Sequence, residues 1–220
     1  MGMTELEREL TEGESLADLL EQIGNVPLNR IPLRPPPGTA TELDVLTMER
    51  RPRKKLCELV DGVLVEKAMG SKEAVLALWL GHLLLTFLDE HNLGIALGAD
   101  GMLKLFPGQV RIPDVSFISW DRLPNGEPPD EPIWGVVPNL AVEVISKSNT
   151  KAEMQRKLRD YFFAGVQVVW LIYPETETAE IYTAAAKKRR VRKDQALTAD
   201  AVLPGFSLPL KQLFRPKKKP

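Results

Sequence analysis

Short apolar runs, most of them alternating with polar residues, fill the middle of this chain and predict a sheet of short strands. The clearest are "CELVDGVLVE" (57–66), in which the Asp61-Gly62 pair is typical of a tight hairpin turn, and "RIPDVSFIS" (111–119). Further strands are expected at 94–98, 102–106, 140–146, 168–174 and 179–184. These runs predict a domain built on strands.

Two segments have helical periodicity instead. Residues 72–90 are apolar over most of their length, and Ser71 stands where a helix cap belongs. The second helix follows Thr150 and Glu153, which form a capping box, and ends before Gly165, a typical C-terminal cap. Both helices are long enough to cover a sheet.

The order of these elements predicts the fold class. Strands 140–146 and 168–174 flank the second helix, so we expect them to be parallel neighbours. The expected fold is α/β, with a central mixed β-sheet flanked by helices. Residues 1–45, a short helix and a proline-rich linker, are expected to form an arm, residues 46–214 the domain, and residues 215–220 a basic tail.

The composition excludes some classes of protein but does not indicate a function. Of 220 residues, 44% are hydrophobic and 27% charged, and the net charge is −1, so contact with nucleic acid would need a local basic patch. A single cysteine, Cys57, excludes an internal disulfide and a cysteine zinc site, and favours a cytoplasmic location. The most apolar stretch, 74–88, is short for a bilayer span, so no membrane role is expected.

Two predicted strands each carry one acid among apolar residues, Asp114 and Glu143. A buried carboxylate is costly unless it is paired, protonated or bound to a metal. Side chains alternate along a strand, and if the two strands are in register these acids stand about 5 Å apart. Carboxylates that close suit Mg²⁺, which takes one or two of them together with waters and phosphate.

A lysine interrupts the apolar face of the second helix. Lys157 lies three residues after Met154 and four before Tyr161, so it points towards the sheet with them. Asp114, Glu143 and Lys157 would then converge as a site. A buried structural ion triad is the competing interpretation, and Tyr161 could either support Lys157 or simply pack.

At these residues the chain resembles the Uma family of restriction-endonuclease-like proteins, formerly a domain of unknown function. The resemblance extends from the proline-rich segment to the C-terminus. It is carried, in this order, by "CELVDGVLVEKAMG" (57–70), "VRIPDVSFIS" (110–119), "LAVEVISKSNT" (140–150), "KLRDYFFAGVQVVWLIYP" (157–174) and "VLPGFSLPL" (202–210).

The resemblance implies a PD-(D/E)XK nuclease core. Asp114 follows a proline, as the first acid does in that superfamily, and Glu143 opens the E-x-K triplet. Ile145 replaces the triplet lysine, and the resemblance implies that Lys157 supplies the ammonium from the helix. An additional acid is expected on the first core helix, with Glu73 as the candidate by position and Glu58 and Glu66 ranked below it.

We therefore expect a Mg²⁺- or Mn²⁺-dependent endonuclease that hydrolyses DNA, with Asp114 and Glu143 as metal ligands and Lys157 and Glu73 as further catalytic residues. A homodimer is expected, because cutting two strands takes two sites. Basic runs at 50–55, 187–193 and 217–219 could contact the DNA backbone. The alternative is an inactive nucleic-acid-binding or scaffold module, which Ile145 and the balanced charge favour. The substrate could also be RNA.

Overall fold

The protein folds around two β-sheets, seen in a computed structural model that describes residues 15–214 except 53 and 69. The expected basic tail and most of the first predicted helix lie outside these residues. One sheet has the order β11-β10-β9-β8-β6-β3, the other the order β2-β1-β5-β4-β7, and a small third sheet pairs β12 with β13. Both α and β elements contribute to the core, as the sequence predicts.

The strands have the following bounds: β1 (Cys57–Val60), β2 (Val63–Glu66), β3 (Gly94–Leu97), β4 (Met102–Phe106), β5 (Gln109–Arg111), β6 (Val115–Ser119), β7 (Ile133–Trp134), β8 (Leu140–Val144), β9 (Val168–Tyr173), β10 (Thr178–Ala184), β11 (Lys187–Val191), β12 (Ala196–Thr198) and β13 (Ser207–Pro209). The helices are α2 (Leu16–Gln22), η1 (Leu28–Arg30), α3 (Glu42–Arg50), α4 (Ser71–His91), η2 (Trp120–Arg122), η3 (Pro124–Gly126), α5 (Lys151–Ala164) and α6 (Leu210–Leu213).

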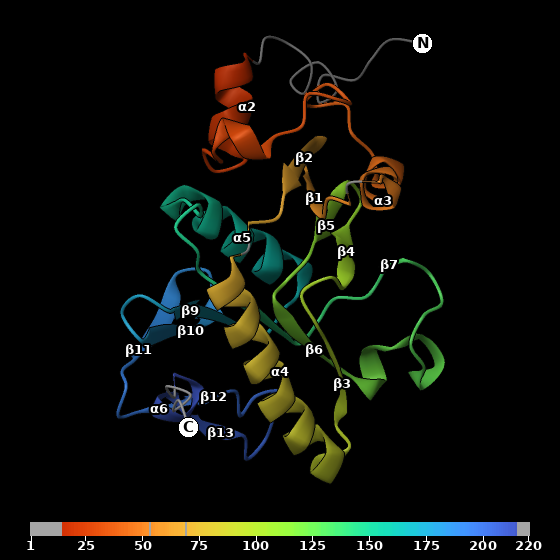
Figure 1. The fold of residues 1–220 in the computed structure, drawn as a ribbon. Helices are drawn as coiled ribbons and strands as arrows, with labels where there is room; N and C mark the ends of the chain where they lie inside the picture. Colours follow the sequence, from red (N-terminus) through yellow and green to blue (C-terminus); the bar gives the residue numbers. More distant parts are fainter. Residues whose placement is uncertain (1–14, 53, 69, 215–220) are drawn as a thin grey trace.

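The six-stranded sheet is mixed and covered on both faces. β8 and β9 are parallel, as predicted, and the other pairs are antiparallel. One face packs on α4 and on the C-terminal segment with β12, β13 and α6. The other face packs on α5 (Figure 1). Residues of opposite parity on β6 confirm the predicted alternation, since Phe117 lies in the first cluster and Ile118 in the second.

The five-stranded sheet carries the N-terminal segment. α3 packs on it through Val45 and Met48, and the arm packs on β1 and β2 through Ile23, Val26 and Ile31. In Figure 1 this arm lies at the top of the view, beyond β2. The predicted linker thus runs into a helix, α3, that the sequence analysis did not find, and the expected boundary after residue 45 falls inside it.

The ends of the core helices follow local sequence signals, with one correction. Ser71 is the first residue of α4 and Gly70 is its cap, so the predicted cap was one residue too late. For α5 the prediction is confirmed: the Thr150 hydroxyl accepts from the Glu153 N–H at 2.9 Å. Gly165 ends the helix with a φ of +100°.

α4 has a buried stripe and an apolar exposed face. Ala77, Leu80, Leu84 and Leu88 are buried against the sheet, while Leu78 is 78% exposed. By length and composition alone α4 could cross a membrane, and core helices of globular proteins meet the same criteria. One face of α4 thus packs on the sheet, and at 21 residues the helix is longer than the apolar stretch that the sequence analysis judged short for a bilayer span.

In the described part of the chain, the order of the strands changes from one sheet to the other five times, and two of these crossings carry residues of the site described below. β5 leads through residues 112–114 directly into β6, and β2 leads through residues 67–70 into α4. Both crossings lie where the two sheets meet. Polar side chains from both sheets can therefore reach one common region.

Candidate active site at the junction of the two sheets

Asp114 and Glu143 face each other across two antiparallel strands. β6 and β8 pair in the register Val115↔Val142, so the next step of the ladder sets Asp114 opposite Glu143. The Asp114 N–H donates to the Val142 carbonyl at 2.9 Å, which continues the pairing. Both acids are buried, with exposures of 3% and 5%. The sequence analysis expected this juxtaposition.

Glu143 receives two side chains from α5. The Lys157 ammonium lies 2.9 Å from each of its carboxylate oxygens, and the Tyr161 hydroxyl donates to Oε1 at 2.5 Å. Lys157 and Tyr161 are one helical turn apart, so both project from the same face of α5. Tyr161 therefore does more than pack, because it fixes one oxygen of the acid that Lys157 also binds.

The third carboxylate comes from β1. Glu58 Oε1 lies 2.9 Å from the Lys157 ammonium, and its Oε2 accepts from Arg111 at 2.8 Å. Glu58 also accepts from the Ile112 N–H at 3.1 Å. Lys157 is thus held between two carboxylates from two different sheets.

Glu73, the acid ranked first for this place, does not join this group. It lies in the first turn of α4, where its carboxylate turns back over Gly70. Among the described residues it forms none of the hydrogen bonds or ion pairs that connect Glu58, Glu143 and Lys157. Glu58, which the sequence analysis ranked below Glu73, is therefore the acid that the structure brings together with Lys157 and Glu143.

Further buried polar groups are connected to Glu58 through Arg111. Arg111 also pairs with Asp160, which accepts from Gln109 at 2.7 Å and from Arg156 at 2.8 Å. These groups neutralise the buried charges behind the site and fix Arg111 against Glu58. Replacing one of them would leave a buried charge without its partner.

Asp114 has a different partner, Lys67. Asp114 Oδ2 accepts from the Val144 N–H at 2.6 Å, and Oδ1 lies 2.9 Å from the Lys67 ammonium. Oδ1 is buried, and the Lys67 ammonium is its one partner among the described residues. Lys67 also donates to three backbone carbonyls, so it neutralises Asp114 while it is shared among four oxygens.

Burial and charge act in opposite directions on the pKa values here. Burial raises the pKa of Glu143, and Asp114 and Glu58 add to the rise against the effect of Lys157. Burial also acts to raise the pKa of Glu58, but Lys157 and Arg111 outweigh it and hold that pKa at about 2. Burial acts to lower the pKa of Lys157, and the Glu143 and Glu58 carboxylates outweigh it and raise that pKa. Lys157 therefore stays an ammonium at neutral pH.

Two hollows approach Asp114 and Lys67 from outside. One, of about 290 Å³, runs between α4 and β3 and reaches Asp114. The other, of about 590 Å³, is lined by Lys67 together with Lys54, Lys55 and Asp100. The two hollows share Ala99, so the Lys67–Asp114 pair lies where they approach each other.

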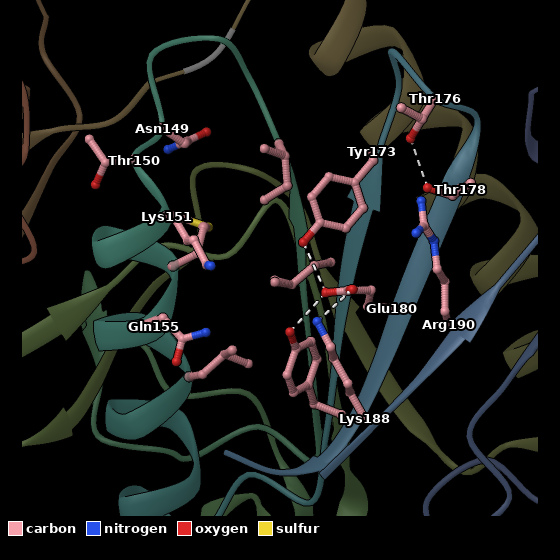
Figure 2. A pocket seen from close by; sticks show the side chains of 15 residues that line it. Asn149, Thr150, Lys151, Gln155, Tyr173, Thr176, Thr178, Glu180, Lys188 and Arg190 are labelled. Carbon is pink, nitrogen blue, oxygen red and sulfur yellow. Dashed lines mark hydrogen bonds and ion pairs between the residues drawn. The ribbon is translucent and has the colours of Figure 1, made fainter. Parts of the chain in front are cut away.

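A third hollow, of about 460 Å³, lies between the start of α5 and the strands β9, β10 and β11. Figure 2 shows Glu180 in its floor, where the carboxylate accepts from Tyr173, Tyr182 and Lys188 at 3.0, 2.8 and 2.7 Å. Lys151 and Arg190 also line this hollow, and among the described residues neither forms an ion pair. We call it the α5–β11 groove.

The α5–β11 groove lies beside the acid site. Leu171, which lines it, is the register partner of Glu143 in the parallel pair β8–β9. Ile145, the residue in the place of the E-x-K lysine, also lines it. The side chain two residues after Glu143 thus faces this groove, and the ammonium near Glu143 comes from Lys157 of α5.

Some residues of this site were marked by a pattern in the sequence, and others were not. Glu58 stands alone in a four-residue strand whose positions are all buried, the same signal that identified Glu143. Lys67 follows β2 in a connection without periodicity, and no pattern in the sequence marked it. Arg111 begins the "RIPDV" run, but its partners come from β1 and α5.

Comparison with known proteins places the chain in a family. Residues 42–211 match the family model described as "Uma2: Putative restriction endonuclease". The crystal structure of a "putative nuclease belonging to DUF820" from Anabaena variabilis aligns with a TM-score of 0.66 and 19% identity, and covers 76% of this chain and 94% of that one. No curated protein matches the chain. The structural likeness establishes a common fold.

Proposed function

This chain belongs to the Uma2 family, and on that premise we propose that it is a nuclease that hydrolyses DNA phosphodiester bonds with the help of Mg²⁺ or Mn²⁺. One observation carries the proposal. Asp114, which directly precedes β6 and lies opposite Glu143, has a buried carboxylate oxygen, Oδ1, with no partner among the described residues other than the Lys67 ammonium at 2.9 Å. Buried polar atoms are normally hydrogen-bonded, and exceptions often mark a site for an ion or a reaction.

The oxygen ligands that the chain offers here are of the types found in magnesium sites. Mg²⁺ is commonly held by one or two carboxylates together with waters and substrate phosphate, and Asp114 and Glu143 would supply the two carboxylates. In the described residues no group of three or more acidic, histidine or cysteine side chains has a metal-binding arrangement, so the remaining ligands would be water and phosphate. When bound, the cation would stabilise charge that develops on the phosphate oxygens.

Lys157 would act in this reaction as a cation. Its raised pKa keeps it protonated, because Glu143 and Glu58 outweigh the effect of burial. An ammonium at this place can orient a water molecule and stabilise a developing negative charge, but it cannot accept the proton of that water. Glu58 holds Lys157 in position, and Tyr161 holds Glu143.

The α5–β11 groove would bind the DNA backbone. Lys151 and Arg190 line it and have no ion-pair partner among the described residues, so their charges are free to meet phosphates. Asn149 and Gln155 offer further amide hydrogen-bond donors along the same wall, as Figure 2 shows. A DNA strand bound in this groove would lie next to the acids of the site, with Leu171 between them.

The isosteric change Asp114→Asn tests the proposed reaction. It removes the charge but keeps an oxygen for the Val144 N–H, so we expect Mg²⁺-dependent cleavage of duplex DNA to fall at least about a hundredfold while the protein stays folded. Cleavage is measured on a labelled duplex with Mg²⁺ or Mn²⁺, and folding by circular dichroism. Cleavage by the Asn variant at the wild-type rate would refute the assigned role of Asp114.

A second function, an inactive scaffold that binds nucleic acid, is favoured by a different observation. Every buried acid of the site has a cationic partner within the chain, since Lys67 neutralises Asp114 and Lys157 neutralises Glu143 and Glu58. Such a set can exist as a structural ion network without a metal. The two functions differ in calorimetry, because a scaffold would release no heat on titration with Mn²⁺ while still binding DNA.

The expected homodimer and cytoplasmic location stay predictions. A dimer would bring two sites to the two strands of a duplex. Analytical ultracentrifugation of the full chain, with and without duplex DNA, would measure the first of these.

A further inference from the structure

We propose that the Lys67 ammonium occupies the cation position at Asp114, so that a metal ion can bind there only after this side chain has moved away. The inference rests on the proposed metal-dependent function and concerns its regulation. It makes Lys67 an internal competitor of the metal, supplied by the connection between β2 and α4.

The surroundings of Lys67 are those of a bound cation. Its ammonium lies 2.9 Å from Asp114 Oδ1 and 2.9, 2.7 and 3.3 Å from the carbonyl oxygens of Ala99, Ile112 and Pro113. Carboxylate and carbonyl oxygens of this kind are also ligands of hard divalent cations. A positive charge thus already stands where four oxygens converge.

The Lys67 ammonium contacts more oxygens than it has hydrogens. An ammonium has three N–H donors, whereas four oxygens lie within 3.3 Å of it, with Asp114 Oδ1 at 2.9 Å. Among the described residues, Asp114 Oδ1 has no partner other than this ammonium. Lys67 thus fills a site built from one carboxylate oxygen and three backbone oxygens.

The location of Lys67 also fits a gate. Its side chain is 6% exposed, and it lines the hollow that contains Lys54 and Lys55. Asp114 lines the neighbouring hollow along α4. Lys67 comes from a connection between elements, so its side chain can leave towards the first hollow without breaking a strand or a helix.

The two cations exclude each other. A divalent ion in contact with Asp114 Oδ1 would lie within a few ångströms of the Lys67 ammonium, where like charges repel strongly in a buried site. Binding of the metal therefore has to displace Lys67, and the energy of its four oxygen contacts is subtracted from the metal affinity. Removing the lysine should strengthen metal binding by at least about tenfold.

Lys67→Met tests this competition, because methionine keeps an unbranched chain and lacks the charge. Mn²⁺ alone is the probe, and both its affinity by calorimetry and the unfolding temperature in EDTA and in Mn²⁺ are measured on the full chain. We expect the variant to bind Mn²⁺ at least about tenfold more tightly than the wild type. We also expect it to unfold at a lower temperature in EDTA, where Asp114 has lost its cation, and to regain stability in Mn²⁺.

Control variants test whether the change in Mn²⁺ affinity and stability is specific to Lys67 and Asp114. Lys54→Met removes a charge from the same hollow, where Lys54 pairs with Glu49 at the surface, and should change neither quantity. The double variant Lys67→Met with Asp114→Asn should be stable in EDTA and lose the response to Mn²⁺. Lys67→Gln, which keeps an amide donor for the carbonyls, replaces Lys67→Met if that protein does not fold.

The outcomes separate this inference from the proposed function. Equal Mn²⁺ affinity of Lys67→Met and wild type, in a protein that cleaves DNA, would overturn the competition and leave the nuclease intact. Absence of Mn²⁺ binding in both would overturn the competition and the metal-dependent nuclease together. Tighter binding in the variant without any DNA cleavage would support the competition and remove the nuclease.

Discussion

At the scale of single residues, the site is a set of buried charges that are each paired across an element boundary. Glu58 on β1 meets Lys157 on α5, and Glu143 on β8 meets the same lysine. A buried charge without its partner costs several kcal/mol, so each of these residues contributes to the stability of the fold as well as to the proposed chemistry. Stability measurements can therefore detect the pairing independently of activity.

Glu58 should make the folded protein sensitive to acid. Its pKa falls from 4.5 to about 2 on folding, so the folded state binds fewer protons, and the stabilisation is complete above pH 4.5 and is lost as the pH falls towards 2. Glu58→Gln should cost roughly 3 kcal/mol at pH 7 and make the unfolding free energy less dependent on pH between 4.5 and 2. Urea unfolding at several pH values measures this.

The exposed Glu127 provides a matched control for that measurement. Glu127→Gln should leave both the stability and its pH dependence as in the wild type. If Glu58→Gln kept the wild-type slope, Glu58 would not be the acid responsible.

At the scale of elements, alternation on β11 divides its basic residues between two faces. Arg190 pairs in register with Glu180 and faces the α5–β11 groove (Figure 2). Arg189, the preceding residue, points to the opposite face and donates to Thr198 of β12 at 3.1 Å. Most of the basic run at 187–193 is thus a strand with one side available to the groove, although the sequence analysis predicted no strand there.

This division predicts different effects of two neighbouring arginines. Arg190→Ala should weaken binding of duplex DNA and reduce the dependence of log K on log salt concentration by about one, the effect of one lost phosphate contact. Arg189→Ala removes the same charge from the other face and should leave that slope unchanged. Fluorescence anisotropy in EDTA at several salt concentrations distinguishes the two, and equal effects would contradict a role for the groove.

At the scale of the whole molecule, the N-terminal arm is fastened to the helix that carries Lys157. Arg30 binds the Glu153 carboxylate at 2.9 and 3.0 Å, and the Thr150 hydroxyl donates to the Gly24 carbonyl at 2.6 Å. The described part of the arm therefore completes the N-terminal end of α5 and packs on the domain of the same chain.

The backbone of α5 lies so close to Gly24 that adding a single methyl group at this position tests the contact. Gly24 has a φ of +89°, and a Cβ there would lie 2.6 Å from the Glu153 Cα, so Gly24→Ala should destabilise the protein by roughly 2–4 kcal/mol and expose the arm to proteolysis. Gly108 has a φ of +76°, and among the described residues no atom lies within 4 Å of its added Cβ. Gly108→Ala should cost only about 1 kcal/mol, as measured by thermal unfolding.

The sequence by itself determined the strands β1–β4, β6 and β8–β10, the hairpin at Asp61-Gly62, the caps of α5 and the faces on which Asp114, Glu143 and Lys157 lie. It did not indicate β7 or β11–β13, and it joined β5 and β6, which belong to different sheets, into one strand. These features depend on periodicity and on contacts between residues close in the chain, which a sequence displays directly. The parallel pairing of β8 and β9 followed from the helix between them.

Only the tertiary structure decided which charges meet. Glu58 rather than Glu73 reaches Lys157, and Lys67 reaches Asp114, because two sheets meet at the crossings after β2 and β5. Strand order and the path of a connection depend on how whole elements pack, and neither leaves a period in the sequence. The energy of these buried ion pairs exists only after packing has excluded water, so no local pattern could have identified them.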